Sequence, residues 1–122
     1  MTARLKAYAP YSKFLVGAAV RDEQGRVFAG CNIENAAYPQ GWCAEPSAIS
    51  ALVMGGGTRI TEVAVLGNGD VLCTPCGGCR QKIREFAGGN VKIHVCAEDG
   101  SVKRSFTLDE LLPFSFGPEH LK

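Results

Sequence analysis

Three cysteines and one glutamate have the residue types and the spacing to bind a metal ion and move a proton. Cys43 and Glu45 lie in the run Cys-Ala-Glu, and Cys76 and Cys79 lie in the later run Pro-Cys-Gly-Gly-Cys. Cysteine thiolates bind Zn²⁺, and a catalytic zinc site has three protein ligands and leaves the fourth position for water. A glutamate two residues after the first cysteine would reach that water and exchange protons with it. The sequence therefore predicts a catalytic zinc centre.

Two other interpretations of these cysteines remain open. A structural zinc site needs a fourth protein ligand, and neither His94, in the middle of an expected strand, nor His120, near the end of the chain, is well placed to provide it. A redox site at Cys76 and Cys79 would be expected after the first strand of a thioredoxin-like unit, whereas this pair comes late. The lack of a fourth ligand favours catalysis.

Composition limits the classes of protein that the chain could represent. Its 122 residues are 46% apolar, which predicts a single globular domain over residues 1–122. No segment approaches the roughly 18 apolar residues of a membrane span, so we expect no membrane partner. The 13 Lys and Arg are scattered and offset by 12 Asp and Glu, giving a net charge of +1. Nucleic acid is therefore not expected as a partner either.

The other cysteines are interpreted by compartment. The first residues lack the apolar stretch of a secretory signal, which predicts a cytoplasmic protein with reduced thiols. Cys31, Cys73 and Cys96 lie among apolar residues, and we expect them to be buried without a chemical role.

The elements that must position the centre follow from periodicity and turn signals. Gly55 to Gly57 ends an amphipathic segment after Cys43, and Asp22 to Gly25 separates two strand-like runs as a hairpin turn. A loop is expected over 34–42 and a turn over 67–70. The expected helices are 2–8, 44–54, 76–87 and 108–112, and the expected strands are 14–21, 26–33, 60–66, 91–96 and 102–106.

This order predicts an α/β fold that brings the cysteines together. Strand-helix-strand units need right-handed crossovers, so the central strands should be parallel, with both main helices on one face of the sheet. Both helices would then begin at the same end of the sheet. Cys43 would lie at one helix N-terminus and Cys76 and Cys79 at the other, where each helix contributes roughly +0.5 charge toward the thiolates.

The sequence resembles a known family over nearly its whole length. The matching runs are 8–14, 16–19, 30–36, 43–45, 75–81, 111–113 and 116–118. They are similar to the small zinc-dependent cytidine deaminases, which share the zinc signature of deaminases. The resemblance implies a three-layer α-β-α fold with a five-stranded mixed sheet, and hydrolysis of cytidine and deoxycytidine to uridine and deoxyuridine with release of ammonia. It also implies a homotetramer with shared active sites.

The resemblance assigns roles near the metal. Water activated at the zinc would attack C4 of the base, while Glu45 takes its proton, passes it to N3 and later protonates the leaving amine. The backbone N–H of Ala44 would hold the base carbonyl, and the carbonyl of Thr74 would hold the amino group.

Five further residues are implied in substrate binding. Asn32 and Glu34 correspond to the ribose-binding pair of the family, although without the resemblance they would be read as solvated loop residues. Phe14 corresponds to an aromatic that lines the base pocket. Phe116 and Tyr38 correspond to residues that reach the substrate of a neighbouring subunit.

The sequence departs from the family pattern at two positions. Many members have an arginine after Cys-Ala-Glu whose guanidinium offsets the charge of the thiolates, and this chain has Pro46 there. Proline fits the first turn of a helix, so the fold is compatible with it. Arg80 is a candidate replacement, with a solvated helix position as the alternative. Leu15 stands where the family often has proline.

Three other functions remain open. A deaminase of another small aminopyrimidine, such as a nucleoside antibiotic, would have the same fold, although Asn32 and Glu34 favour an ordinary ribose. A polynucleotide deaminase would typically have His in place of Cys43 and would need a basic channel. A zinc-stabilised interaction module would bind zinc without catalysis.

Overall fold

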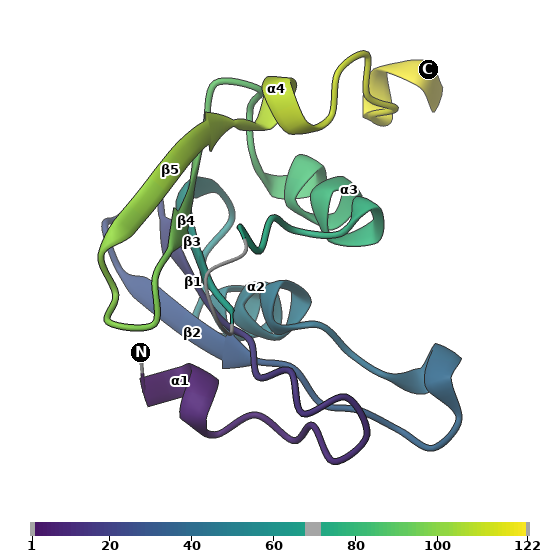
Figure 1. Ribbon diagram of the computed structural model, residues 1–122. Coiled ribbons are helices and arrows are strands. Elements are labelled where there is room, and N and C mark those ends of the chain that lie inside the picture. The colour runs from purple at the N-terminus through teal and green to yellow at the C-terminus, as the bar shows by residue number, and fades with distance from the viewer. Residues whose placement is uncertain (1, 68–71, 122) are drawn as a thin grey trace.

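One five-stranded sheet forms the centre of the computed structural model, which describes residues 2–67 and 72–121. The strands lie in the order β2-β1-β3-β4-β5 (Figure 1). β3 and β4 are parallel, and the other neighbouring pairs are antiparallel, so the predicted mixed sheet is confirmed. The strands are β1 Gly17–Asp22, β2 Val27–Cys31, β3 Ile60–Leu66, β4 Lys92–Cys96 and β5 Val102–Thr107. The helices are α1 Thr2–Leu5, α2 Ala44–Met54, α3 Gly77–Phe86 and α4 Leu108–Leu111, with 3-10 turns at Tyr38–Gln40 and Pro118–Leu121.

Both main helices cover the same face of the sheet, as predicted (Figure 1). Their apolar side chains form one buried core with the inward residues of the strands, because apolar area removed from water is the main stabilising contribution to folding. The approach of α2 is close: a Cβ on Gly30 would lie 2.5 Å from the backbone nitrogen of Ala48, so only glycine fits there. The core residues include Val20, Ile49, Leu52, Val63, Ile83, Ile93 and Leu108.

The opposite face of the sheet carries the short helix α1. A Cβ on Gly17 would lie 2.7 Å from the backbone nitrogen of Arg4, which places α1 directly against β1. The predicted helix over 2–8 ends earlier, at Leu5. Tyr8 leaves the helix because its backbone N–H donates to the carbonyl of Asn32 and its carbonyl accepts from Glu34. Pairing with the chain beyond β2 therefore replaces the last helical turn.

The parallel pair β3-β4 sets the position of the cysteines. Ala64 pairs with His94 at its centre, and both strands run in the same direction. α2 leads into β3, and α3 connects β3 to β4, so both helices begin at the end of the sheet where β3 ends (Figure 1). The bounds of α2 and β3 agree with prediction, whereas most of the turn predicted over 67–70 lies outside the described residues.

Candidate metal centre and active site

Both main helices begin immediately after a cysteine. Cys43 is the N-cap of α2 and Cys76 is the N-cap of α3, both with extended backbone dihedral angles. Neither side chain makes the usual capping hydrogen bond to the first turn of its own helix, so both sulfurs are available to bind a metal ion. Cys79 lies in the first turn of α3 and is buried. Two helix N-termini, each with a partial positive charge, thus point toward the same group of thiols.

The three sulfurs have the spacing of a zinc site. Their Sγ atoms lie within 4.8 Å of one another, with Cys43 to Cys76 at 4.0 Å and Cys76 to Cys79 at 3.3 Å. Thiolates on a tetrahedral zinc with bonds of about 2.3 Å lie about 3.8 Å apart. The residues present therefore fit the ion, and among the described residues no other group of His, Cys, Asp and Glu is arranged to hold one.

Contact among the thiols makes them chemically unequal. Hydrogen bonds from Cys79 and then Cys76 lower the pKa of the Cys43 thiol to about 6, with a further contribution from the charge of Lys82, although burial opposes them. The pKa of Cys79 is raised, because its hydrogen bond to Cys43 and its burial favour the protonated form. The cluster thus holds a negative charge near neutral pH even without a metal, which favours cation binding.

Glu45 lies in the first turn of α2 with only 4% of its surface exposed. Burial raises the pKa of its carboxyl group, and the negative charge of Cys43 adds to this effect. A hydrogen bond from the backbone N–H of Glu45 itself lowers the pKa, but by less. A carboxyl group with a raised pKa both accepts and releases a proton readily, as an acid-base catalyst must.

A cavity of about 160 Å³ lies over the cysteines and Glu45. The predicted residues Asn32, Ala44 and Thr74 contribute to its wall, together with Val16 and Cys73. Its volume is below that of typical ligand sites, which span roughly 300–1,000 Å³, so it suits one ring of a substrate rather than a whole nucleoside. A second cavity of about 400 Å³, lined by Tyr11, Ser12, Glu34, Asn35, Tyr38 and Gly41, has room for a larger group.

Asn32 and Glu34 hold the segment that carries Phe14. Asn32 accepts from the backbone N–H of Val16 at 2.9 Å and donates to the carbonyl of Phe14 at 3.1 Å. Glu34 accepts from the backbone N–H groups of Tyr11 and Ser12 and from the Ser12 hydroxyl. A Cβ on Gly67 would lie 3.2 Å from the Phe14 ring and 2.7 Å from Cys73, so the ring lies beside the cavity wall.

Tyr38 and Phe116 are not among the residues that line the cavity over the cysteines. Tyr38 is 76% exposed and its ring meets Tyr11 edge to face at 6.2 Å. Phe116 is 55% exposed, stacks on His120 with ring centroids 5.0 Å apart, and accepts from Gln81 through its carbonyl. The structure therefore groups the cysteines, Glu45, Asn32, Ala44 and Thr74 around one cavity, and leaves these two aromatics outside it.

The structure gives two neighbours of the site places that differ from those expected from the sequence. Cys73 was expected to be buried without a role, but it is partly exposed and lines the cavity; Cys31 and Cys96 are also partly exposed. The position of Cys73 in the sequence, between β3 and Thr74, was the available signal that it lies near the site. Arg80 donates to the carbonyls of Pro75 and Leu111, both at 2.7 Å, and to the Thr74 hydroxyl at 3.2 Å. It is therefore an anchor of the loop before Cys76.

This fold and site define a class of protein. Three cysteines and a buried glutamate, gathered at two helix N-termini on one side of a mixed sheet, are the arrangement of zinc-dependent deaminases. Residues 1–95 match the model of the cytidine and deoxycytidylate deaminase zinc-binding region. The chain belongs to this family, whose cofactor is zinc.

Similar proteins extend the match to nearly the full length. The chain is 41% identical over 119 residues to a cytidine deaminase of Sporosarcina psychrophila, covering 98% of this chain and 87% of that protein. It is 44% identical over 116 residues to a cytidine deaminase of Mycobacterium tuberculosis, covering 94% and 82%. The crystal structure of the Burkholderia pseudomallei cytidine deaminase superposes with a TM-score of 0.86 at 39% identity, covering 94% of this chain and 91% of that one.

Proposed function

We propose that this protein catalyses the zinc-dependent hydrolysis of cytidine and deoxycytidine to uridine and deoxyuridine, with release of ammonia. The observation that carries the proposal is the position of the buried Glu45 beside three sulfurs that lie within 4.8 Å of one another. Membership of the deaminase family and the two relatives that are cytidine deaminases support it.

The chain's own groups provide the other parts of the reaction. Cys43, Cys76 and Cys79 hold the zinc. When bound, zinc acts as a Lewis acid that makes water a nucleophile near neutral pH. Glu45 takes a proton from the attacking water and delivers it to N3 of the base. It then takes the second proton, from the hydroxyl now bonded to C4, and delivers it to the amino group, which leaves as ammonia while C4 becomes a carbonyl.

Backbone groups and aromatic rings orient the substrate. The N–H of Ala44, at the start of α2, donates to the base carbonyl, and the carbonyl of Thr74 accepts from the amino group. Both residues line the cavity over the cysteines, which has room for a single ring. Phe14 lies against the base, and Asn32 and Glu34 bind the ribose with the hydrogen-bonding capacity that the 11–16 segment does not use.

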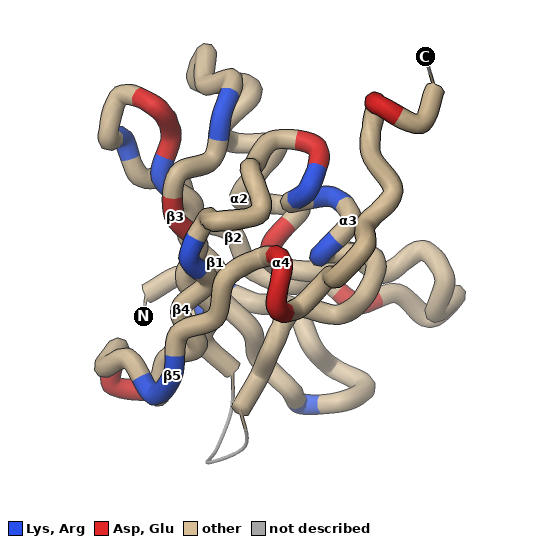
Figure 2. The backbone as a smooth tube through the Cα atoms, turned by 90° about the horizontal axis from the view of Figure 1, so that it is seen from above, with Lys and Arg blue, Asp and Glu red and all other residues tan. Residues whose placement is uncertain are grey.

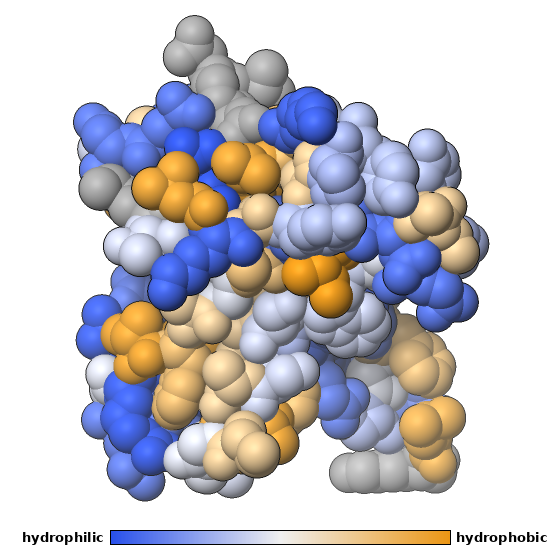
Figure 3. Space-filling model, turned by 90° about the horizontal axis from the view of Figure 1, so that it is seen from below, coloured by the Kyte–Doolittle hydropathy of each residue, from blue (hydrophilic) through white to orange (hydrophobic). Residues whose placement is uncertain are grey.

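Residues 1–122 form one domain in this proposal, and four copies share their active sites. Phe116 contacts His120 and Gln81 rather than the cavity of its own chain, which is consistent with a ring that serves a neighbouring subunit. Tyr38 would also reach a neighbour's ribose. Figure 3 shows apolar side chains exposed in several separate groups among polar ones.

The proposed partners are small nucleosides, without nucleic acid or membrane. Basic and acidic residues are interspersed along the chain in Figure 2, whereas a polynucleotide channel needs a basic surface. In the part of the chain that the structure describes, every helix is too short or too polar to cross a bilayer. We also propose a cytoplasmic location, which fractionation of producing cells would test.

Purified protein with cytidine tests the proposal directly. We expect the ultraviolet absorbance of cytidine to fall as uridine forms, and a chelator to stop the reaction until zinc is restored. The mass in solution should be about four times 13.0 kDa. Faster turnover of a non-ribosyl aminopyrimidine, or stoichiometric zinc without any loss of cytidine, would contradict the proposed substrate or the proposed catalysis.

A further inference from the structure

The sulfur cluster poses a problem of charge that the ligands themselves do not solve. In the proposed function, on which this inference rests, three thiolates surround one divalent ion and leave a net charge of −1. The two helix N-termini contribute roughly +0.5 each, but their effect falls off within the first turn. A fixed cation close to the sulfurs would stabilise the metal-bound thiolates.

Two positions near the cluster are less suited to provide that cation. Pro46, in the first turn of α2, is buried and carries no charge. Arg80 follows Cys79 directly, but its guanidinium donates to the carbonyls of Pro75 and Leu111 and to the hydroxyl of Thr74. Its hydrogen bonds therefore hold the loop before Cys76 and the end of α4.

Lys82 lies where both helix N-termini meet. Its Nζ is 5.4 Å from the centre of the ring of Trp42, the residue before Cys43. The same side chain bends back along α3, since a Cβ on Gly78, between Cys76 and Cys79, would lie 3.6 Å from Nζ. One ammonium group thus lies beside the residue before Cys43 and the residue before Cys79, held by a cation–π contact.

We propose that Lys82, held over the Trp42 ring, is the counter-charge of the three-cysteine centre. It acts through the thiolates, as a positioning residue, rather than on the substrate. Because Lys82 is exposed, its effect is moderate and decreases as salt screens it.

The test compares zinc affinity in three variants by competition with a chromophoric chelator, in the absence of substrate. Lys82→Met keeps the length and the contact with Trp42 but removes the charge, and at low salt it should weaken zinc binding by about three- to fivefold. Lys82→Arg should retain the affinity of the wild type. Lys92→Met is the matched control: it removes the same charge from an exposed lysine at the start of β4, and it should leave zinc affinity unchanged.

Salt and cobalt separate an electrostatic role from a structural one. The difference in zinc affinity between wild type and Lys82→Met should shrink several-fold between about 0.01 M and 0.5 M salt. The reason is that the electrostatic screening length falls from about 30 Å to a few ångströms. The Co²⁺-substituted Lys82→Met protein should show the wild-type thiolate-to-metal absorption spectrum. An unchanged affinity at low salt, an equal loss in Lys92→Met, a loss insensitive to salt, or a changed cobalt spectrum would each overturn the proposal.

The outcome is distinguishable from that for the proposed function. Wild-type protein that binds zinc but leaves cytidine intact would contradict the deaminase proposal alone. The zinc affinities of the Lys82 variants would then still test the counter-charge proposal. Wild-type protein that binds no zinc would overturn both.

Discussion

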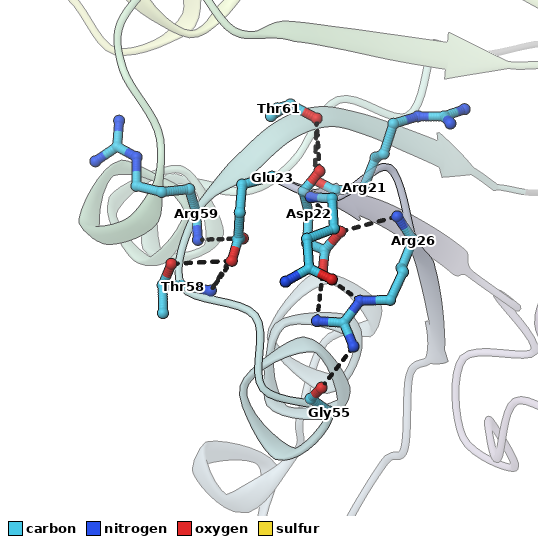
Figure 4. Close-up of polar contacts among 9 residues, drawn as sticks. Arg21, Asp22, Glu23, Arg26, Gly55, Thr58, Arg59 and Thr61 are labelled. Carbon is cyan, nitrogen blue, oxygen red and sulfur yellow. Dashed lines mark hydrogen bonds and ion pairs between the residues drawn. The ribbon is translucent and has the colours of Figure 1, made fainter.

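A buried carboxyl group lies at each end of helix α2, and the two differ in how their pKa is shifted: Glu45 lies in the first turn of the helix, and Asp22, the last residue of β1, lies beside its C-terminal end. At the C-terminal end, Asp22 is 1% exposed and accepts from the backbone N–H groups of Gln24 and Arg26 and from the Arg26 side chain, which also donates to the carbonyl of Gly55 (Figure 4). Burial opposes ionisation of Asp22, but these hydrogen bonds outweigh it and lower its pKa. At the N-terminal end, burial raises the pKa of Glu45.

The difference separates stability from chemistry. A buried carboxylate is costly unless hydrogen bonds and a counter-charge compensate for lost solvation, and Asp22 has both. Glu45 is buried beside a cluster that also tends to be negative, so its carboxyl group holds a proton more firmly than an exposed glutamate does. The contacts of Asp22 therefore hold the C-terminal end of α2 (the hairpin end) against the β1-β2 hairpin. The N-terminal end (the cysteine end) carries the acid-base group Glu45.

Neutralising Glu45 should have the largest effect and should affect activity alone. Glu45→Gln keeps the shape of the side chain but cannot accept and release a proton, so we expect turnover of cytidine to fall at least ~100-fold. Zinc content, measured by metal analysis, and the melting temperature should stay at the wild-type level or above, because an amide is less costly to bury than an ionisable carboxyl group. Near-normal turnover would contradict the role of Glu45.

Neutralising Asp22 should show the reverse pattern. Asp22→Asn removes the negative charge that pairs with the Arg26 guanidinium and replaces one acceptor oxygen by an NH2 donor. A donor that now bonds to this oxygen would be left without a partner. We expect the melting temperature, measured by circular dichroism, to fall by several degrees, while turnover per folded molecule at low temperature changes by less than about twofold. Asp99→Asn is the control, since that carboxylate lies exposed in the β4-β5 turn with Ser101 as its partner. A large loss of turnover in Asp22→Asn without loss of stability would remove the contrast.

The cysteine end of α2 was more predictable from sequence than the surroundings of the site. The spacing of apolar residues gave the bounds of α2 and β3, and the preference for right-handed crossovers brought Cys43 to Cys76 and Cys79. These inferences use local periodicity and topology, which the sequence carries directly.

Contacts between distant residues were not predictable in the same way. Nothing in the spacing of Trp42 and Lys82 indicates that the ammonium lies over the ring, because this depends on how α3 lies beside the start of α2. Asn32 and Glu34 were predicted as ribose ligands. In the structure their side chains accept hydrogen bonds from backbone N–H groups of the 11–16 segment, which the sequence did not indicate. The early end of α1 likewise results from pairing of Tyr8 with Asn32 and Glu34, a tertiary contact that outweighs helix propensity.

The smallest expected effect is a pH-dependent contribution to stability at the hairpin end. Glu23, next to Asp22, accepts from the backbone N–H groups of Thr58 and Arg59 and from the Thr58 hydroxyl, which ties the hairpin turn to the segment that follows α2 (Figure 4). Hydrogen bonds from its own backbone N–H and from Thr58 lower its pKa from 4.5 to about 2. A carboxyl group with a depressed pKa in the folded state stabilises the fold above its unfolded pKa, and this contribution is lost as pH falls from about 4.5 toward 2.

Glu23→Gln should therefore be less stable than the wild type above pH 5, and the difference should narrow as the pH is lowered toward 2. Urea unfolding monitored by Trp42 fluorescence at several pH values measures it, with Glu85→Gln, an exposed position on α3, as the control. Turnover at neutral pH should be unchanged, because the turn lies at the far end of α2 from Glu45. A stability difference that stays constant with pH would mean that the Glu23 contacts act through packing rather than through ionisation.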